Sequence, residues 1–204
     1  MHELIEGYRS FRRERWTGER ERYVALATHG QKPQTLVITC SDSRCDPATI
    51  FNASPGSMFV IRNVAAIVPP FESDNGHHGT SAAIAFAVLK LKIRNILVMG
   101  HAQCGGVAAA LDHSIAQGIP FLSSWVDLLA PAARRIAPGD EASRHVALER
   151  ESVRLSLERL MTFPFVAERV KEGLMDLNGA RFGIADGELE ILDPATGEFE
   201  AVGG

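Results

Sequence analysis

The sequence predicts an α/β protein with a mainly parallel β-sheet, flanking helices, an N-terminal helical arm and a C-terminal edge strand or hairpin. Three short apolar runs are typical of strands buried on both faces, and they span residues 35–39, 58–61 and 95–99. Between the second and third runs, the Ala-rich residues 79–92 have apolar side chains nearly all round, which predicts a well-buried crossover helix. The order strand, helix, strand indicates a parallel sheet.

The flanking segments are expected to be helical, and the end of the chain is not. Residues 2–29 combine Glu and Arg with apolar positions at helical spacing and are broken near Thr17-Gly18, which predicts a helical arm. Residues 181–192 alternate in polarity around Asp186-Gly187, so we expect a closing hairpin or edge strand. Three further amphipathic helices are expected in between, at residues 122–137, 142–162 and 165–174.

Length and composition bound the class of protein. At 204 residues the chain fits a single domain, 1–204, in which we expect an arm, 1–29, and an α/β core, 30–204. A formal net charge of -4 and the lack of a long basic run argue against nucleic acid as a partner. No stretch approaches the ~20 apolar residues of a membrane span, so we expect no membrane association.

The N-terminal segment carries charges where a secretory signal needs an apolar core, which predicts a cytoplasmic protein. Disulfides are rare in that compartment. The three cysteines are therefore expected to bind metal or to remain buried thiols.

Two short segments carry residues that can bind a metal ion or take part in catalysis. Cys40-Ser-Asp-Ser-Arg44 follows the first predicted strand, and His101-Ala-Gln-Cys104 follows the third. In open parallel sheets, ligands bind beyond the carboxyl ends of the strands. We therefore expect the two loops to converge on one site, although about sixty residues separate them.

Cys40, His101 and Cys104 form a set of metal ligands. Zinc accepts thiolate and imidazole ligands, and catalytic zinc sites use three protein ligands and leave the fourth position open. The only nearby candidate for a fourth ligand, Cys45, would have to bend back over Arg44. Each residue alone is more simply explained as a buried thiol or a core histidine. Together they favour a catalytic zinc ion.

Asp42 and Arg44 are two residues apart, so an extended loop would place both side chains on the same side as Cys40. An Arg fork on a carboxylate lowers its pKa and fixes its orientation. Asp42 would then accept the proton of a zinc-bound hydroxide and turn an oxygen lone pair towards the substrate. The alternative is a structural Asp-Arg brace within the loop.

This pattern resembles the β-class carbonic anhydrases, or carbonate dehydratases, of the plant-like open-site type. The similarity covers essentially residues 30–110 and, more loosely, the remainder. The resemblance implies one zinc ion per chain and reversible hydration of carbon dioxide to bicarbonate and a proton by attack of zinc-bound hydroxide. The two motifs of the family, C-x-D-x-R and H-x-x-C, are represented by Cys40, Asp42, Arg44, His101 and Cys104.

Other functions remain open. Relatives of the family hydrolyse carbonyl sulfide or carbon disulfide, and the nucleophile would be identical. A zinc-stabilised binding protein without turnover is a further alternative, although it would not need the Asp42–Arg44 pair. A phosphatase or sulfurtransferase with a cysteine nucleophile is disfavoured, because the loop after Cys40 is too short and too acidic to cradle a phosphate.

The resemblance also implies a pocket for carbon dioxide that lies partly at a subunit boundary. Gln31 occupies the place of a glutamine that donates a hydrogen bond to the substrate. Phe86 falls where plant-like members carry a tyrosine, so the function of that hydroxyl is missing. The remaining pocket residues by this correspondence are Phe59, Val64 and Gly105, and ordinary core packing is the simpler interpretation of Val64.

Some members of the family have a non-catalytic bicarbonate site made of tryptophan, arginine and tyrosine. Arg62 is present in this chain, but Val37 and Phe182 stand at the other two positions, so we expect no bicarbonate switch of that type. The resemblance further implies a homodimer or homotetramer in which the arm embraces the neighbouring subunit.

Three other side chains near these motifs have a chemical and a simpler interpretation. Cys45 is either a packing residue or a redox-sensitive thiol. His77 and His78 either carry protons or belong to a solvated loop.

We expect the activity to rise towards alkaline pH. Two thiolates neutralise the formal charge of zinc, so its water should be less acidic than the pKa of ~7 reached with three neutral histidines. Stopped-flow hydration of carbon dioxide measured from pH 6 to 9 checks this expectation, and a flat profile would contradict it.

Overall fold

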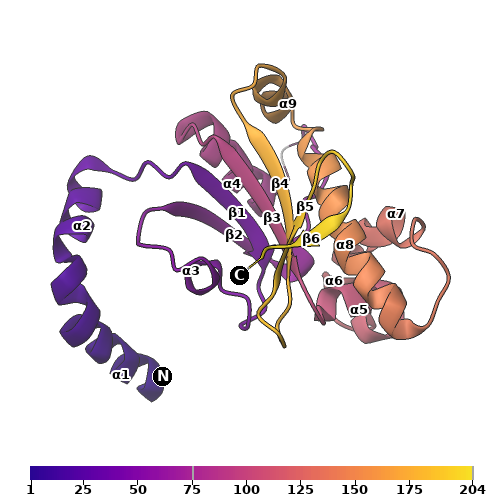
Figure 1. Cartoon of the computed structure of the whole chain (residues 1–204), viewed down its shortest axis with the longest axis horizontal. Coiled ribbons are helices and arrows are strands. Elements are labelled where there is room, and N and C mark those ends of the chain that lie inside the picture. Colours follow the sequence, from indigo (N-terminus) through magenta and orange to yellow (C-terminus); the bar gives the residue numbers. More distant parts are fainter. Residues whose placement is uncertain (75, 204) are drawn as a thin grey trace.

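The computed structural model describes residues 1–74 and 76–203. Its centre is a six-stranded sheet in the order β2-β1-β3-β4-β5-β6 (Figure 1). The pairs β2–β1, β1–β3 and β3–β4 are parallel, and β5 and β6 continue the sheet as antiparallel strands. The predicted α/β class is confirmed. The strands are β1 (Thr35–Cys40), β2 (Met58–Asn63), β3 (Asn95–His101), β4 (Asp176–Phe182), β5 (Leu189–Leu192) and β6 (Phe199–Ala201).

Helices connect the parallel strands and cover the sheet. The long helix α8 packs against β3 and β4. None of the helices in the described residues is both long enough and apolar enough to cross a membrane. The helices are α1 (His2–Ser10), α2 (Trp16–His29), α3 (Pro47–Ile50), α4 (Gly79–Ala85), α5 (Gly105–Leu111), α6 (Leu122–Val126), α7 (Ala130–Ala133), α8 (Glu141–Leu160) and α9 (Pro164–Lys171).

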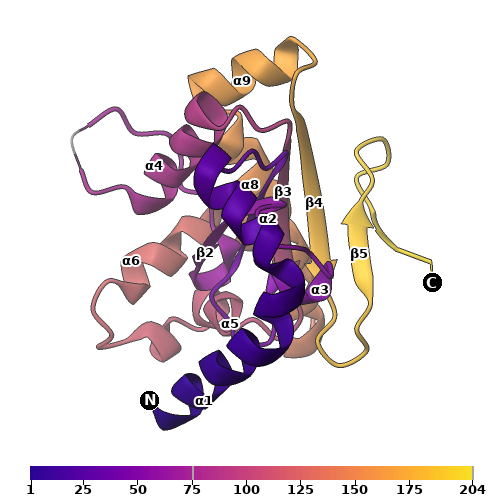
Figure 2. The same ribbon diagram turned by 90° about the vertical axis from the view of Figure 1, so that its left-hand side faces the viewer.

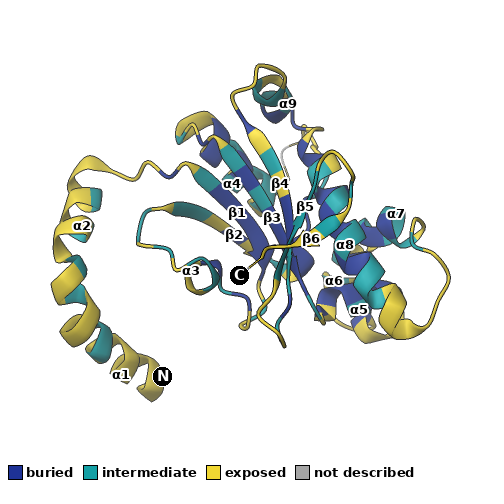
Figure 3. Cartoon of the chain, in the orientation of Figure 1, coloured by how far each residue is buried: buried dark blue, intermediate teal, exposed yellow. Residues whose placement is uncertain are grey.

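The arm stands away from the sheet, and none of the residues of α1 and α2 is buried (Figures 1 and 3). The break expected near Thr17-Gly18 is wrong, because α2 continues through both residues. A glycine inside a helix costs only about 1 kcal/mol relative to alanine, which is too little to end the helix. The irregular part is instead a π-helical turn at Phe11–Arg15.

The crossover helix between β2 and β3 is present but is less buried than its sequence suggests. It comprises α4 and a π-helical turn at Phe86–Lys90. Ile84, Ala87 and Val88 are fully buried, whereas Phe86 is 46% exposed. One apolar face of this helix is therefore uncovered in the single chain.

The continuous helix expected at residues 122–137 is also wrong. This segment forms α6, a 3-10 turn at Asp127–Leu129 and α7. Pro131 lies in the first turn of α7. Because proline has no backbone N–H, it begins a helix readily but disrupts the helix interior.

The C-terminal hairpin is confirmed, with one correction to its extent. Phe182 pairs with Leu189 across a turn in which Gly187 has a φ of 73°. Its first strand starts earlier than expected, at Asp176, and is an inner strand paired in parallel with β3. Figure 2 shows β5 beside β4 at the outer side of the sheet.

The approach of α8 to the sheet depends on two glycines. A Cβ atom at Gly179 would lie 2.8 Å from the side chain of Val153, and one at Gly100 would lie 3.0 Å from it. Both distances are too short for ordinary packing. Glycine at these positions lets α8 lie directly on β3 and β4. The core around this contact includes Leu36, Ile38, Ile84, Ile96, Val98, Val153, Leu160 and Phe163.

Candidate metal centre

The two motif loops meet at the carboxyl ends of β1 and β3. Cys40 is the last residue of β1, His101 is the last residue of β3, and Cys104 immediately precedes α5. The thiol sulfurs of Cys40 and Cys104 are 4.0 Å apart. One ligand atom from each of the three residues lies within 4.8 Å of the other two. The structure therefore brings the predicted ligands together.

The His101 ring faces this group with a free lone pair. Its Nδ1 lies 2.8 Å from the carbonyl of Ala102, an acceptor, so Nδ1 carries the proton and Nε2 does not. Nε2 is buried without a hydrogen-bond partner. A buried polar atom without a partner is costly unless something binds it. The site therefore fits a cation that accepts nitrogen and sulfur ligands.

The two thiols are buried and interact strongly. Cys40 Sγ accepts a hydrogen bond of 3.4 Å from the backbone N–H of Ala65. Hydrogen bonds from Cys104 and Cys45 also lower the pKa of Cys40, so the first thiolate forms there. The Cys40 thiolate in turn raises the pKa of Cys104. Without a cation, two thiolates this close repel each other.

Asp42 and Arg44 form a bidentate pair beside the ligands. Arg44 donates to the two carboxylate oxygens at 3.0 and 2.7 Å. This pairing lowers the pKa of Asp42 to about 2. Asp42 Oδ2 lies 3.9 Å from His101 Nε2, and Arg44 also reaches the carbonyl of Gln103 at 3.5 Å. The carboxylate is thus ionised at neutral pH and lies next to the group of ligands.

Arg62 holds the loop that begins at Cys40 through contacts with its backbone. Its guanidinium donates to the carbonyls of Cys40 and Asp42 at 3.0 and 2.6 Å, and it pairs with Asp46 at 3.3 Å. Val37 is buried in β1. Arg62 therefore already has three partners within the chain.

Cys45 is fully buried beside Cys40 but does not belong to the group of three ligands. Its thiol lies 3.3 Å from the carbonyl of Asp42, to which it donates. The neighbouring Cys40 and burial raise its pKa, so it remains a neutral thiol. Its placement agrees with the packing interpretation.

The loop histidines lie outside the group of three ligands. His77 is exposed, and His78 contacts Asp74 and Glu72. A hydrogen bond to Asp74 raises the pKa of His78. The structure therefore gives His78 local acidic partners and shows no contact between it and the ligands.

The predicted pocket residues separate into two groups. Val64 and Gly105 lie near the ligands, since Gly105 follows Cys104 and the next residue, Gly106, packs so closely on Val64 that a Cβ there would be 2.6 Å away. Phe59 is level with Leu36 at the start of β1.

Phe59, Gln31 and Phe86 form the second group. They lie towards the amino ends of the parallel strands, opposite to the end that carries the ligands. The rings of Phe59 and Phe86 stack with centroids 5.8 Å apart. Gln31 precedes β1 and is exposed. At about 3.3 Å per residue, the start of β1 is about 17 Å from Cys40, so these residues do not line the site of their own chain.

The residues that bind the backbone around the metal ligands were not identified from the sequence. Trp125 Nε1 donates to the carbonyl of Val64 at 2.9 Å. Glu149 accepts a hydrogen bond of 2.6 Å from the backbone N–H of Gln103, and His145 contacts the carbonyl of Cys104 at 3.1 Å. In the sequence, Glu149 belongs to a charged run of an amphipathic helix and looks like a solvent-exposed residue.

Comparison with known proteins gives a consistent result. A family model described as "Carbonic anhydrase" matches residues 35–189. The chain is 35% identical over 198 residues to "Beta carbonic anhydrase 6, mitochondrial" of Arabidopsis thaliana. The aligned part covers 93% of this chain and 67% of that relative.

Solved structures agree with the sequence comparison. The β-carbonic anhydrase CcaA superimposes with a TM-score of 0.90 at 32% identity, covering 100% of this chain and 92% of CcaA. One of two tetrameric β-carbonic anhydrases from Sordaria macrospora gives a TM-score of 0.81 at 31% identity, covering 94% and 95%.

The fold and the site define an α/β enzyme with a buried sulfur and nitrogen metal site at the carboxyl edge of a parallel sheet. With the family match over most of its length, the chain belongs to the β-class carbonic anhydrases, enzymes that hydrate carbon dioxide.

The Asp42–Arg44 pair predicts a pH-dependent contribution to stability. Because the pKa of Asp42 is about 2 in the folded chain and ~3.9 in an unfolded one, its stabilising effect is complete above about pH 5 and is lost as the pH falls towards 2. The difference in unfolding free energy between wild type and Asp42→Asn should be constant from pH 5 to 7 and shrink below pH 4. Urea unfolding of chelator-treated protein measures it, and the difference should be small at every pH in an Arg44→Leu background.

Proposed function

We propose that this chain hydrates carbon dioxide reversibly with one zinc ion held by Cys40, His101 and Cys104. The observation that carries this proposal is the buried, unpartnered Nε2 of His101, which faces two buried thiols. Thiolate and imidazole ligands with this geometry suit zinc better than the hard cations that prefer oxygen. Three protein ligands leave a fourth position for water or substrate.

Zinc at an open site acts as a Lewis acid that makes water a nucleophile near neutral pH. The chain supplies the orientation. Asp42, held by Arg44 and ionised at neutral pH, can only accept hydrogen bonds. With zinc bound, its Oδ2 would therefore accept a hydrogen bond from the attacking oxygen and leave a lone pair of that oxygen facing carbon dioxide. Arg44 keeps the carboxylate from rotating away, because both of its oxygens are bound.

The apolar part of the pocket is proposed to come from two chains. Phe59 and Phe86 stack near the start of β1, and Gln31 precedes β1, so all three lie about a strand length from the metal site of their own chain. A second copy in the opposite orientation would bring them to its partner's site. The arm, whose residues are all unburied, and the exposed Phe86 give this homodimer an apolar surface to cover. A homotetramer could form by pairing two such dimers, as the Sordaria relatives are described as tetrameric.

We further propose a single domain, 1–204, consisting of an arm, 1–29, and a zinc-binding core, 30–204, that works in the cytoplasm. The core is continuous from β1 to β4 around shared buried residues. The three cysteines are unpaired and buried, which fits a reducing compartment.

Replacing Asp42 by asparagine should separate metal binding from catalysis. The amide can donate a hydrogen bond where the carboxylate could only accept, so we expect kcat/KM for hydration to fall by about 10²-fold with the zinc content unchanged. Stopped-flow assays at pH 8.5 with metal analysis check this. Asp127→Asn, at an exposed pair with His113, is the matched control and should retain wild-type activity. Full activity in Asp42→Asn would contradict the assigned function of this carboxylate.

Mixing a weakly active variant with an inactive one tests the shared pocket. Gln31→Ala should be weakly active because the partner's site lacks its donor, and Cys40→Ser should be inactive because it lacks a ligand. In a mixed dimer, one of the two sites has intact Cys40 from one chain and intact Gln31 from the other. About half of the dimers in an equimolar, re-equilibrated mixture are mixed, so about one site in four should recover activity. Gln34→Ala, a nearby exposed glutamine, should stay active alone. A mixture with no recovered activity would contradict the shared pocket.

A further inference from the structure

We infer that Glu149 is a positioning residue that holds the His101–Cys104 loop in the one conformation in which both ligands face the metal site. This inference rests on the proposed function, because it concerns the same ligands. Glu149 touches neither substrate nor metal. It acts through the backbone N–H of Gln103 directly and through the carbonyl of Cys104 by way of His145.

The loop has a strained residue that needs an external support. Gln103 adopts a φ of 56°, in the left-handed region that residues other than glycine rarely occupy. Such a conformation costs about 1–3 kcal/mol and persists only where the surroundings enforce it. The strain lies between His101 and Cys104, so releasing it would change the relative direction of these two ligands.

Glu149 meets this need from a buried position. It is 1% exposed, and its Oε1 accepts the N–H of Gln103 at 2.6 Å. Its Oε2 accepts from Arg181 Nε at 2.7 Å. A buried carboxylate is costly unless it is paired and hydrogen-bonded, and this one is both. It therefore has no freedom to leave the Gln103 N–H without losing its own partners.

His145 extends the support to the second ligand. It lies one helical turn before Glu149 on α8, with Nδ1 3.3 Å from Glu149 Oε1 and Nε2 3.1 Å from the carbonyl of Cys104. Its contact with Glu149 sets the direction of the ring. One face of α8 therefore contacts two consecutive residues of the loop, Gln103 and Cys104.

The support is itself anchored to the sheet. Arg181 lies on β4 in register with Gly100, the residue before His101, and also contacts Glu190 of β5 at 3.5 Å. The close packing of Val153 on Gly100 and Gly179 fixes α8 one turn beyond Glu149. Glu149 is thus tied through Arg181 to β4, the neighbour of the strand that carries His101, so contacts within the chain define the geometry of the loop.

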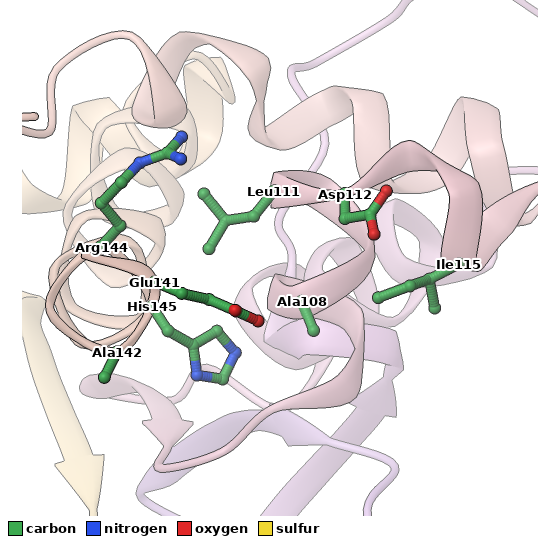
Figure 4. A pocket seen from close by; sticks show the side chains of 8 residues that line it. All are labelled: Ala108, Leu111, Asp112, Ile115, Glu141, Ala142, Arg144 and His145. Atoms are coloured by element: carbon green, nitrogen blue, oxygen red, sulfur yellow. The ribbon is translucent and has the colours of Figure 1, made fainter. Parts of the chain in front are cut away.

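The side of His145 away from the loop faces an open cavity. Figure 4 shows the His145 ring in the wall of this cavity, which has a volume of about 640 Å³. Its other walls include Ala108 and Leu111 of α5 and Arg144 of α8. Because the ring has space on this side, packing alone does not hold it against Cys104. Its polar contacts with Glu149 and with the carbonyl of Cys104 hold it in place.

The test compares zinc affinity in Glu149→Gln, Glu149→Ala and His145→Ala by competition with a chromophoric chelator. Mutating a residue that hydrogen-bonds to a metal ligand typically weakens metal affinity by 10–100-fold. We therefore expect zinc binding to be about tenfold weaker in Glu149→Gln and about 100-fold weaker in Glu149→Ala. Glutamine has one acceptor oxygen, so it can keep the Gln103 or the Arg181 contact but not both. His145→Ala should weaken binding less, and the visible spectrum of the cobalt-substituted protein should shift in all three.

Glu151→Gln is the matched control, since Glu151 lies on the same helix in a pair with Arg135 and does not touch the loop. It should bind zinc with wild-type affinity. A purely structural function of Glu149 would lower the unfolding temperature and leave zinc affinity and the cobalt spectrum unchanged. Wild-type affinity in both Glu149→Gln and His145→Ala would overturn the inference, and these two variants decide it if Glu149→Ala does not fold. Failure of the wild-type chain to bind one zinc ion would instead overturn the proposed function.

Discussion

The parallel pairing of β1 with β3 is the constraint on which the site depends. The register sets Thr39 opposite Met99, so both strands end at the same edge and place Cys40 and His101 side by side. Bringing together residues about sixty positions apart costs loop-closure entropy that a flexible chain could not recover from a few contacts. The buried strands supply the compensation, because their apolar side chains form the core. The metal centre is therefore a consequence of sheet packing and forms where the packed strands end.

The charges around this edge are matched in pairs. Arg44 neutralises Asp42, Arg62 pairs with Asp46, and Arg181 pairs with buried Glu149. The two thiols are the exception, since neither has a cationic side chain within the described contacts. Their close approach destabilises the doubly ionised state unless a cation is bound. The fold thus leaves the negative charge of the two thiols without a cationic side chain, at the same place where His101 Nε2 has a free lone pair.

The sequence predicts the parts of this structure whose cause is local. Buried parallel strands appear as continuous apolar runs, and Cys40, Asp42 and Arg44 lie within five residues. β4 was recognised only in part because Gly179 is selected for the approach of α8 and not for strand propensity. Glu149 could not be predicted, since its burial depends on the same approach of α8. The pocket residues were assigned by resemblance alone, and only the structure shows that three of them lie at the other edge.

That separation is the structural reason for proposing that two chains share one pocket. The two ends of the strands in a parallel sheet differ. The loops that carry ligands follow the carboxyl ends, and the amino ends lie a full strand length away. Phe59 is in register with Leu36 near the start of β1, and Gln31 precedes β1, so both lie towards the amino ends of the strands. In the proposed homodimer, a two-fold axis would reverse the second copy and set the amino ends of its strands against the carboxyl ends of the first copy's strands, and the same operation would build the second site. The apolar residues Phe86 and Leu89 are 46% and 49% exposed and lie on the helix next to Phe59. In the proposed homodimer, one contact would therefore both cover these residues and complete the pocket, so association and catalysis would be coupled through a single surface.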